Sequence, residues 1–529
     1  MSNTPFTLPD WLSPAHLTTI KRGIEKEGLR MAHSGYSATT PHPTNLGSKL
    51  THPFITTDYS ENLLELITPP YASIDDALAM LKKLHIVVAQ NLGDELMWPL
   101  SMPCMLSDKD TDIPLADYGT SNLGKLKTLY RSGLAVRYGR KMQTIAGIHY
   151  NLSLGDNLFQ AWQHNISPNT AEQHSVGLSG DLQAFKNDKY LGLIRNFKRL
   201  SPLLLYLTGA SPSICPCFVD GRKHNLSPLS DKNTTLYRPY ATSLRMGKLG
   251  YTNSVQENLG IFYNHLDDYI AELKRAVNTP FSAFNAIGVD DSNGMPIQIN
   301  DHILQIENEY YSPIRPKQLT HSGQTPTDAL KERGILYVEF RAIDLNPYSE
   351  IGIDQHTACF LEILAIYCLL LSSPPLYEDE ERLLSNNIET IVNDGRKNGI
   401  TIDTLTGSIA FATWANKHLT AMTTIAELFD KNNNHKPYQT ALQTMLARLA
   451  DSEKTPSARI IADSLKLGST WQLGASLGQA YKQSLLTEGL NTKDQHYFDT
   501  LATTSWQEQK ILEASDTLSF KEYLAPYRS

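Results

Sequence analysis

The stretch Gly23-Ile-Glu-Lys-Glu-Gly-Leu-Arg30 places two carboxylates, Glu25 and Glu27, two positions apart in a run that fits a β-strand. In a strand, residues i and i+2 point to the same face, so both carboxylates lie on one face of the sheet that this strand joins. Four further segments repeat the pattern, with apolar residues filling most alternate positions: 61–68, 147–153, 305–309 and 336–341. The same-face pairs that they predict are Glu61 with Glu65, His149 with Asn151, Glu307 with Glu309, and Glu339 with Arg341. The pattern therefore predicts a sheet with one acidic face.

An acidic sheet face has two interpretations. A single glutamate on a strand usually points to solvent from the outer face of an antiparallel sheet. Several strands with the same pattern, joined by a histidine and an arginine, instead favour a shared interior site. Carboxylates gathered there repel each other unless cations lie between them. Oxygen ligands around open space suit Mg²⁺ or Mn²⁺, the ions that accompany phosphates.

Composition excludes several classes of protein. The 529 residues allow one large core or two to three domains. Lys plus Arg is 47 and Asp plus Glu is 55, a net charge of −8 that argues against nucleic-acid binding. Five cysteines are too few, and odd in number, for a disulfide framework. No secretory signal is visible, and the most apolar stretch, 358–371, contains Glu362 and is too short to span a bilayer. We expect a soluble, cytoplasmic protein without a membrane or nucleic-acid partner.

Local patterns predict the remaining elements. Apolar periodicity and capping residues predict helices at 14–22 after Ser13, from Ser73 onwards, at 185–208 before Gly209, at 264–277 and at 358–371. Strands near 297–310 and 335–343 complete the polar sheet, and 106–128 is expected to form a loop over a site.

The character of the chain changes after Asp354, where helical patterns dominate. We expect one catalytic unit, 1–529, with a sheet-containing core at 1–350 and a mainly helical layer at 351–529. The sharpest candidate boundary, 372–381, also fits an ordinary loop between helices.

Two apparent motifs fail on inspection. Residues 119–125 fit the first seven positions of a phosphate-binding loop, but Leu126 stands where a Ser or Thr binds Mg²⁺, and no convincing strand precedes them. Cys215-Pro-Cys217 lacks the second Cys or His pair of a metal site, so buried structural thiols are the better interpretation. Cys359 and Cys368 fall within the apolar helix and belong to the core.

Tyrosines and arginines recur together. The segment 130–138 contains Tyr130, Arg131 and Arg137, and similar groupings occur at 240–245, 250–253 and 311–317. Each fits an exposed surface segment, or recognition of a carboxylate or phosphate by the guanidinium fork. Each grouping alone decides nothing.

Taken together, these segments resemble the proteobacterial type of glutamate–cysteine ligase. The resemblance covers about 23–346, thins in the helical tail, and includes the run Met142-Gln-Thr-Ile-Ala-Gly-Ile-His-Tyr-Asn151. The other segments that carry the resemblance are 56–69, 97–104, 118–124, 127–131, 304–309 and 313–317.

The resemblance implies a fold and a reaction. The fold is α+β and glutamine-synthetase-like, a curved antiparallel sheet forming a funnel wrapped by helices. The γ-carboxylate of L-glutamate attacks the γ-phosphate of ATP, giving γ-glutamyl phosphate, and the amine of L-cysteine displaces phosphate to form γ-glutamylcysteine. This is the first step of glutathione biosynthesis, and glutathione commonly inhibits it. Mg²⁺, with Mn²⁺ as an alternative, is the implied cofactor, and a monomer is expected.

The resemblance also assigns roles residue by residue. The implied metal ligands are Glu25, Glu27, Asp58, Glu65, His149 and Glu339. It does not support Glu61, Glu307 or Glu309 as ligands. Arg131 and Arg341 are the implied catalytic cations, and Arg315 and Lys317 are candidates for phosphate contact. Substrate recognition maps to Tyr59, Tyr130, Gln143, Arg245, Tyr251 and Tyr311. The hydroxyl of Tyr59 is expected to make the cysteine pocket more polar, and Asp58 is a candidate general base.

Other functions remain open on the residues alone. A related γ-glutamyl ligase would use a different amine acceptor, and a metal-dependent hydrolase would release phosphate without any acceptor. A non-enzymatic binding protein would not need the full set of acids and arginines. A fused glutathione synthetase is disfavoured, because too little chain follows residue 346 for a second ATP-binding domain.

Overall fold

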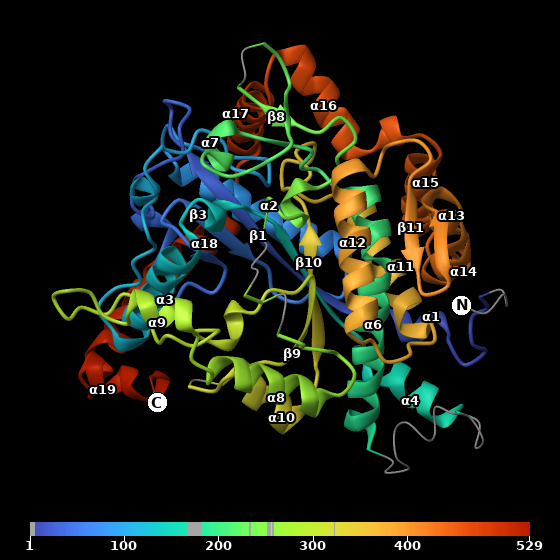
Figure 1. The fold of residues 1–529 in the computed structure, drawn as a ribbon, viewed down its shortest axis with the longest axis horizontal. Helices are drawn as coiled ribbons and strands as arrows, with labels where there is room; N and C mark the ends of the chain where they lie inside the picture. Colours follow the sequence, from blue (N-terminus) through green and yellow to red (C-terminus); the bar gives the residue numbers. More distant parts are fainter. Residues whose placement is uncertain are drawn as a thin grey trace.

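A seven-stranded antiparallel sheet organises the N-terminal two-thirds of the chain (Figure 1). The computed structural model describes residues 6–166, 181–231, 234–250, 255–256, 259–321 and 323–528. Across the sheet the order is β2 (Ile55–Thr57), β3 (Leu63–Ile67), β1 (Lys21–Met31), β5 (Ile148–Ser153), β10 (Tyr337–Ile343) and β9 (Ile314–Lys317). A short strand, β4 (Leu96–Met97), pairs with the end of β1. Mixed helix and antiparallel sheet is therefore the observed class.

The register brings the acidic residues onto one face. Glu25 of β1 lies opposite His149 of β5, and Glu27 lies opposite Glu65 of β3. Directly opposed residues in antiparallel strands point to the same side of the sheet. Glu339 of β10 lies opposite Asn151 of β5. The predicted acidic face is present in four of the five segments.

Helices surround the sheet, and two of them cover its other face. The chain before the apolar tail helix forms α1 (Pro14–Leu17), α2 (Ile74–Asn91), α3 (Asn122–Tyr138), α4 (Asp156–His164), α6 (Leu182–Thr208), α7 (Pro216–Val219), α8 (Leu266–Val277), α9 (Ser282–Ile287) and α10 (Pro326–Arg333). Helix α2 packs on β1 and β3, and α6 packs on β10 and β9. Their apolar side chains meet the alternate positions of the strands, including Ile24, Tyr150 and Phe340. This apolar layer fixes the acidic face toward the opposite side.

The tail is helical and returns to the N-terminal half. It forms α11 (Gln355–Leu370), α12 (Glu378–Asp394), α13 (Phe411–Ala421), α14 (Thr423–Phe429), α15 (Pro437–Ala450), α16 (Pro456–Leu467), α17 (Thr470–Glu488), α18 (Thr492–Ser515) and α19 (Phe520–Leu524). Helices α11 and α12 pack along α6, and α17 packs on α2. In Figure 1, the red helices α18 and α19 lie beside the N-terminal half, and α19 contacts α3. Among the described residues, none of the helices combines the length and apolar composition that crossing a bilayer requires.

Small sheets complete the structure. One contains β6 (Ser213–Ile214), β8 (Leu236–Tyr237) and β7 (Ser227–Pro228), and the other is the hairpin of β11 (Thr401–Thr404) and β12 (Gly407–Ala410).

The helices predicted at 185–208, 264–277 and 358–371 are confirmed within a few residues. Ser73 caps α2 as predicted, because its side chain accepts a hydrogen bond from the Asp76 backbone. Cys359 and Cys368 are buried in α11, also as predicted.

Three predicted elements differ from the structure. The helix after Ser13 ends at Leu17 rather than near 22, because β1 begins at Lys21. Residues 106–128 are only partly a loop, since Ser121 caps α3 and the helix starts at Asn122. Residues 297–310 form no strand: Glu307 and Glu309 lie in a single turn of 3₁₀ helix, η5 (Glu307–Glu309), where a side-chain period of two does not apply.

Candidate active site

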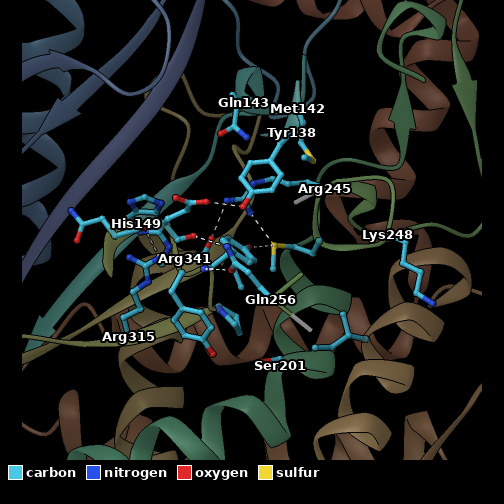
Figure 2. Close-up of a pocket in the computed structure, with 18 of the residues that line it drawn as sticks. Tyr138, Met142, Gln143, His149, Ser201, Arg245, Lys248, Gln256, Arg315 and Arg341 are labelled. Atoms are coloured by element: carbon cyan, nitrogen blue, oxygen red, sulfur yellow. Dashed lines mark hydrogen bonds between the residues drawn. The ribbon is translucent and has the colours of Figure 1, made fainter. Parts of the chain in front are cut away.

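A cavity of about 390 Å³ opens on the acidic side of the sheet. Its lining comes from the sheet, from α3, α6 and α12, and from the turns η3 (Met142–Thr144) and η4 (Leu244–Met246). In Figure 2, His149, Arg315 and Arg341 occupy one side of the cavity and Lys248 the other. Segments far apart in the chain thus converge on one cavity.

A carboxylate–imidazole cluster lies at the sheet. One ligand atom from each of Glu25, His149 and Glu339 lies within 4.8 Å of the other two. The Nδ1 atom of His149 is 3.1 Å from Glu25 Oε2, and its Nε2 atom is 3.6 Å from Glu27 Oε1. Asn151 donates a 2.8 Å hydrogen bond to Glu25 Oε1 and so orients that carboxylate. Two carboxylates and an imidazole at this spacing fit a hard divalent cation such as Mg²⁺ or Mn²⁺.

Three further acids extend the cluster toward the edge of the sheet. Glu27 and Asp58 line the cavity, and Glu65 faces Glu27 across the β1–β3 pair. Burial, followed by the nearby charges of Glu25, Asp58 and Glu27, raises the pKa of Glu65 well above its usual range. Ionised acids at this end of the face therefore repel one another.

At the other end of the sheet face, cations pair with the Glu339 carboxylate. Lys317 Nζ lies 3.1 Å from Glu339 Oε1, and Arg341 Nη1 lies 3.1 Å from Glu339 Oε2. Burial opposes ionisation of Glu339, but these cations and His149 hold its pKa well below the usual range. The sheet face is thus cationic at β9 and β10 and anionic at β1 and β3.

Arginines line the cavity at fixed positions. Arg131 donates to the backbone oxygens of Asp58 (2.5 Å) and Lys127 (2.9 Å), which anchors its guanidinium beside the acids. The buried Nε atoms of Arg315 and Arg341 have no hydrogen-bond partner within the described ranges. Donors fixed in this way are available to an anionic ligand.

The residues expected to recognise substrate lie on the same cavity. Its lining includes Tyr59, Tyr130, Gln143, Arg245 and Tyr311. Arg245 donates to the Arg341 backbone oxygen at 2.9 Å and lies 3.5 Å from Asp344. The buried Tyr59 hydroxyl finds no partner in the part of the chain that the structure describes.

Tyr251 was also expected in this group. It lies outside the described residues.

Three acids have other partners. Glu61 pairs with Lys49 at 2.5 Å, and Glu307 accepts a 2.7 Å hydrogen bond from the Thr327 backbone at the start of α10. Glu309 lines the cavity but binds Arg137 at 3.2 Å and the hydroxyl of Tyr138 at 2.7 Å. These carboxylates hold loops and helices in place.

Sequence reasoning missed part of the lining. Gln256 joins the Tyr311 backbone at 2.8 Å to the Glu309 backbone at 2.9 Å. The Tyr311 hydroxyl donates a 3.4 Å hydrogen bond to Met246 Sδ. The helix α12 contributes Glu381 and Glu389 from beyond the acidic strands. No spacing rule identifies these residues, because tertiary packing alone brings them to the cavity.

An acidic sheet face and a ring of arginines around one cavity define an enzyme that brings small anionic molecules together. The family model described as glutamate-cysteine ligase matches residues 8–391. The chain belongs to the glutamate–cysteine ligase family. The ligation that gives this family its name is a step of glutathione biosynthesis, and its members are ATP-dependent ligases.

Individual relatives agree with this assignment. A glutamate–cysteine ligase of Alcanivorax borkumensis is 45% identical over 519 residues, covering 97% of this chain and 96% of that protein. One of Saccharophagus degradans is 43% identical over 513 residues, covering 97% and 94%.

Solved structures agree as well. The glutamate–cysteine ligase of Francisella tularensis in complex with AMP has a TM-score of 0.87 and 34% identity, covering 96% of this chain and 97% of that one. A bifunctional glutathione synthetase of Pasteurella multocida has a TM-score of 0.71 and 26% identity, covering 92% of this chain and 57% of that one.

Proposed function

We propose that this protein joins the γ-carboxylate of L-glutamate to the amine of L-cysteine through γ-glutamyl phosphate, with ATP converted to ADP and phosphate. The observation that carries the proposal is the convergence of Asp58, Arg131, His149, Arg245 and Arg341 on one cavity of about 390 Å³. Membership of the ligase family and the AMP complex of the Francisella tularensis relative support nucleotide use at this site.

Two anions, a carboxylate and a triphosphate, must approach each other in this reaction. The residues that would hold Mg²⁺, or Mn²⁺ as an alternative, are Glu25, Glu27, Asp58, Glu65, His149 and Glu339. The bound ion would supply positive charge that offsets the repulsion between the two anions. The 4.8 Å cluster and the crowded acids around Glu65 support this ligand set.

The protein's own cations have distinct roles. Arg131 and Arg341 stabilise the charge that develops on the transferred phosphoryl oxygens. Both are held before substrate arrives, Arg131 by the Asp58 backbone and Arg341 by Glu339, so little reorganisation is needed during the reaction. Arg315 is a further phosphate contact, since its buried Nε atom lacks a partner among the described residues.

Substrate is bound by neighbouring polar groups. Arg245 and Gln143 orient the amino-acid substrates, and Tyr130 and Tyr311 enclose them. The family resemblance adds Tyr251 as a further substrate-binding residue. The Tyr59 hydroxyl adds a polar group beside the cysteine thiol. Asp58 is the candidate general base for the cysteine amine, since its carboxylate lines the same cavity.

The architecture serves this reaction as one catalytic unit, 1–529. The curved antiparallel sheet is a glutamine-synthetase-like funnel within 1–350, and 351–529 is a mainly helical layer around it. Contacts between distant segments support the single unit: Ser48 donates to Gln509, and the Thr120 backbone donates to Glu513 at 2.9 Å. The protein acts as a monomer, and glutathione, which contains the product, inhibits it.

The first experiment measures ADP release with Mg²⁺-ATP and L-glutamate, with and without L-cysteine, and identifies the product by mass. Cysteine-dependent ADP release with γ-glutamylcysteine is the expected result. A panel of other amines tests the acceptor, and a better turnover with another amine would replace cysteine in the proposal. ADP release that needs no acceptor would identify a hydrolase.

The metal assignment is tested with matched carboxylate variants. Glu339→Gln is expected to abolish ligation while the fold is retained, because Glu339 belongs to the cluster at the sheet. Glu307→Gln is the control, since its carboxylate binds Thr327 at the start of α10. Near-normal turnover of Glu339→Gln would contradict the assignment.

A further inference from the structure

Three of the five cysteines converge at one place outside the acidic cluster. Cys215 and Cys217 flank Pro216 at the start of α7, and the Cys217 thiol donates to Cys215 Sγ across 2.7 Å. Cys104, more than a hundred positions earlier, brings a second thiol into hydrogen-bonding contact with Cys215. The other two cysteines lie in α11. The sequence alone did not reveal this cluster, because Cys104 joins the pair only through the fold.

The three thiols are chemically unequal. Hydrogen bonds from Cys104 and then Cys217 hold the pKa of the Cys215 thiol well below its usual range. The contact with Cys215, together with burial, raises the pKa values of Cys104 and Cys217. These contacts favour ionisation at Cys215, where two S–H groups would stabilise a thiolate. The thiolate is the nucleophile of cysteine chemistry.

Solvent access favours reaction at the Cys215–Cys217 pair. Cys104 and Cys215 are buried, whereas Cys217 is only partly buried and gives the cluster contact with solvent. The Cys215 and Cys217 sulfurs are already in contact, so joining them needs a small movement. A thiolate with a second thiol in contact is the arrangement in which a mixed disulfide is resolved internally.

The pair is connected to the cavity. Lys141 Nζ donates a 3.0 Å hydrogen bond to the Cys217 backbone oxygen. Lys141 directly precedes the turn that carries Met142 and Gln143, both of which line the cavity. This hydrogen bond gives a movement of Cys217 a direct route to the Gln143 turn.

We propose that Cys215 and Cys217 are a modification site for small-molecule disulfides, and that their oxidation lowers the activity of the enzyme. In the first step a thiolate of the pair attacks one sulfur of RSSR, forming a mixed disulfide and releasing RS⁻. The remaining thiol then loses its proton to solvent and displaces the second RS⁻. The net change is two protein thiols and RSSR giving one intramolecular disulfide and two RSH.

The modification is tested by treating the purified full-length protein with 2-hydroxyethyl disulfide. After removal of the reagent and alkylation of free thiols, intact mass and peptide mapping report each cysteine. The expected product has lost two hydrogen atoms, carries no adduct, and contains a Cys215–Cys217 bond. Cys104→Ser is expected to form the same bond, whereas Cys217→Ser is expected to form none. A bond to Cys104 or a persistent adduct on wild type would overturn the proposal.

The effect on activity is measured with L-2-aminobutyrate as the acceptor, because cysteine itself would reduce the disulfide. This measurement rests on the proposed ligation, whereas the mass measurement does not. Oxidised wild type is expected to lose at least about threefold in ADP release, since small displacements of positioning groups have effects of this size or larger. Dithiothreitol should restore the rate, and the double variant Cys215→Ser/Cys217→Ser, which has neither thiol of the pair, should be insensitive to the reagent. A Cys215–Cys217 bond without loss of activity would refute the proposed coupling.

Discussion

A buried ion pair beneath the sheet gives a sharp prediction about what holds the sheet to the tail. Arg22 of β1 donates to Glu362 of α11 at 2.7 Å and 3.1 Å, and the two side chains are 3% and 0% exposed. The same carboxylate accepts 2.8 Å hydrogen bonds from the hydroxyls of Tyr150 and Tyr438. One carboxylate thus joins two strands to two tail helices on the face opposite the cavity.

The magnitude follows from the burial of this pair. Arg22→Met leaves a buried carboxylate without its cation, which costs about 3–5 kcal/mol. Glu362→Gln alone leaves the guanidinium unpaired and is expected to cost a similar amount. The double variant has no buried charge, and the glutamine amide still binds both tyrosine hydroxyls. Its cost is about 1 kcal/mol, the net value of an ordinary hydrogen bond.

Thermal unfolding measures these differences. Unfolding entropy scales to about 1.1 kcal/mol/K for a chain of 529 residues. Each single variant should therefore lower the midpoint by about 3–5 °C, and the double variant by about 1 °C. The exposed pair Arg382–Asp379 is the control, and Arg382→Met should leave the midpoint unchanged. A double variant as unstable as the sum of the singles would refute the reasoning.

Two further predictions concern the tail and the cavity. Burial lowers the pKa of His418 to about 4, below the unfolded value of 6.5. The unfolded state therefore binds more protons between these pH values, and about 3 kcal/mol of stability is lost as the pH falls from 6.5 to 4. His418→Leu should reduce the fall in the unfolding midpoint measured over that range. An unchanged fall would contradict the role of His418. A Cβ atom on Gly147 would lie 2.0 Å from Arg245 Nη2, so Gly147→Ala should displace this guanidinium and raise the KM for an amino-acid substrate. An unaltered KM would exclude a binding role for Arg245.

Side-chain periodicity was sufficient to predict a strand where one face is polar and the other is buried in the apolar core. β1, β5 and β10 carry acids or a histidine on one side and buried apolar groups on the other, so a period of two was visible. Even there the apolar face contains exceptions. Arg22 and Lys26 are buried on it, and no local rule predicts that the partner of Arg22 lies 340 residues away.

The same spacing failed at 305–309, because two acids two positions apart also fit a tight turn. There Glu309 is held by Arg137 and Glu307 by Thr327, so both charges stabilise the structure. The cavity wall from α12 was likewise beyond prediction, since packing along α6 brings it to the site. Local patterns thus identified the sheet strands that line the site, whereas tertiary contacts bring the remaining lining residues to it.

The uneven charge along the sheet face predicts where a divalent cation stabilises the protein. Lys317 and Arg341 already neutralise Glu339, whereas Glu65 is crowded by other acids. Mg²⁺ at one hundred times its dissociation constant should add about 2.7 kcal/mol, or about 2–3 °C in the unfolding midpoint. Glu65→Gln relieves the repulsion and removes a ligand, so it should raise the metal-free midpoint and reduce the shift that Mg²⁺ produces. Glu307→Gln should keep the full shift. An equal shift in Glu65→Gln would mean that Mg²⁺ screens a general acidic surface and is not bound at β1 and β3.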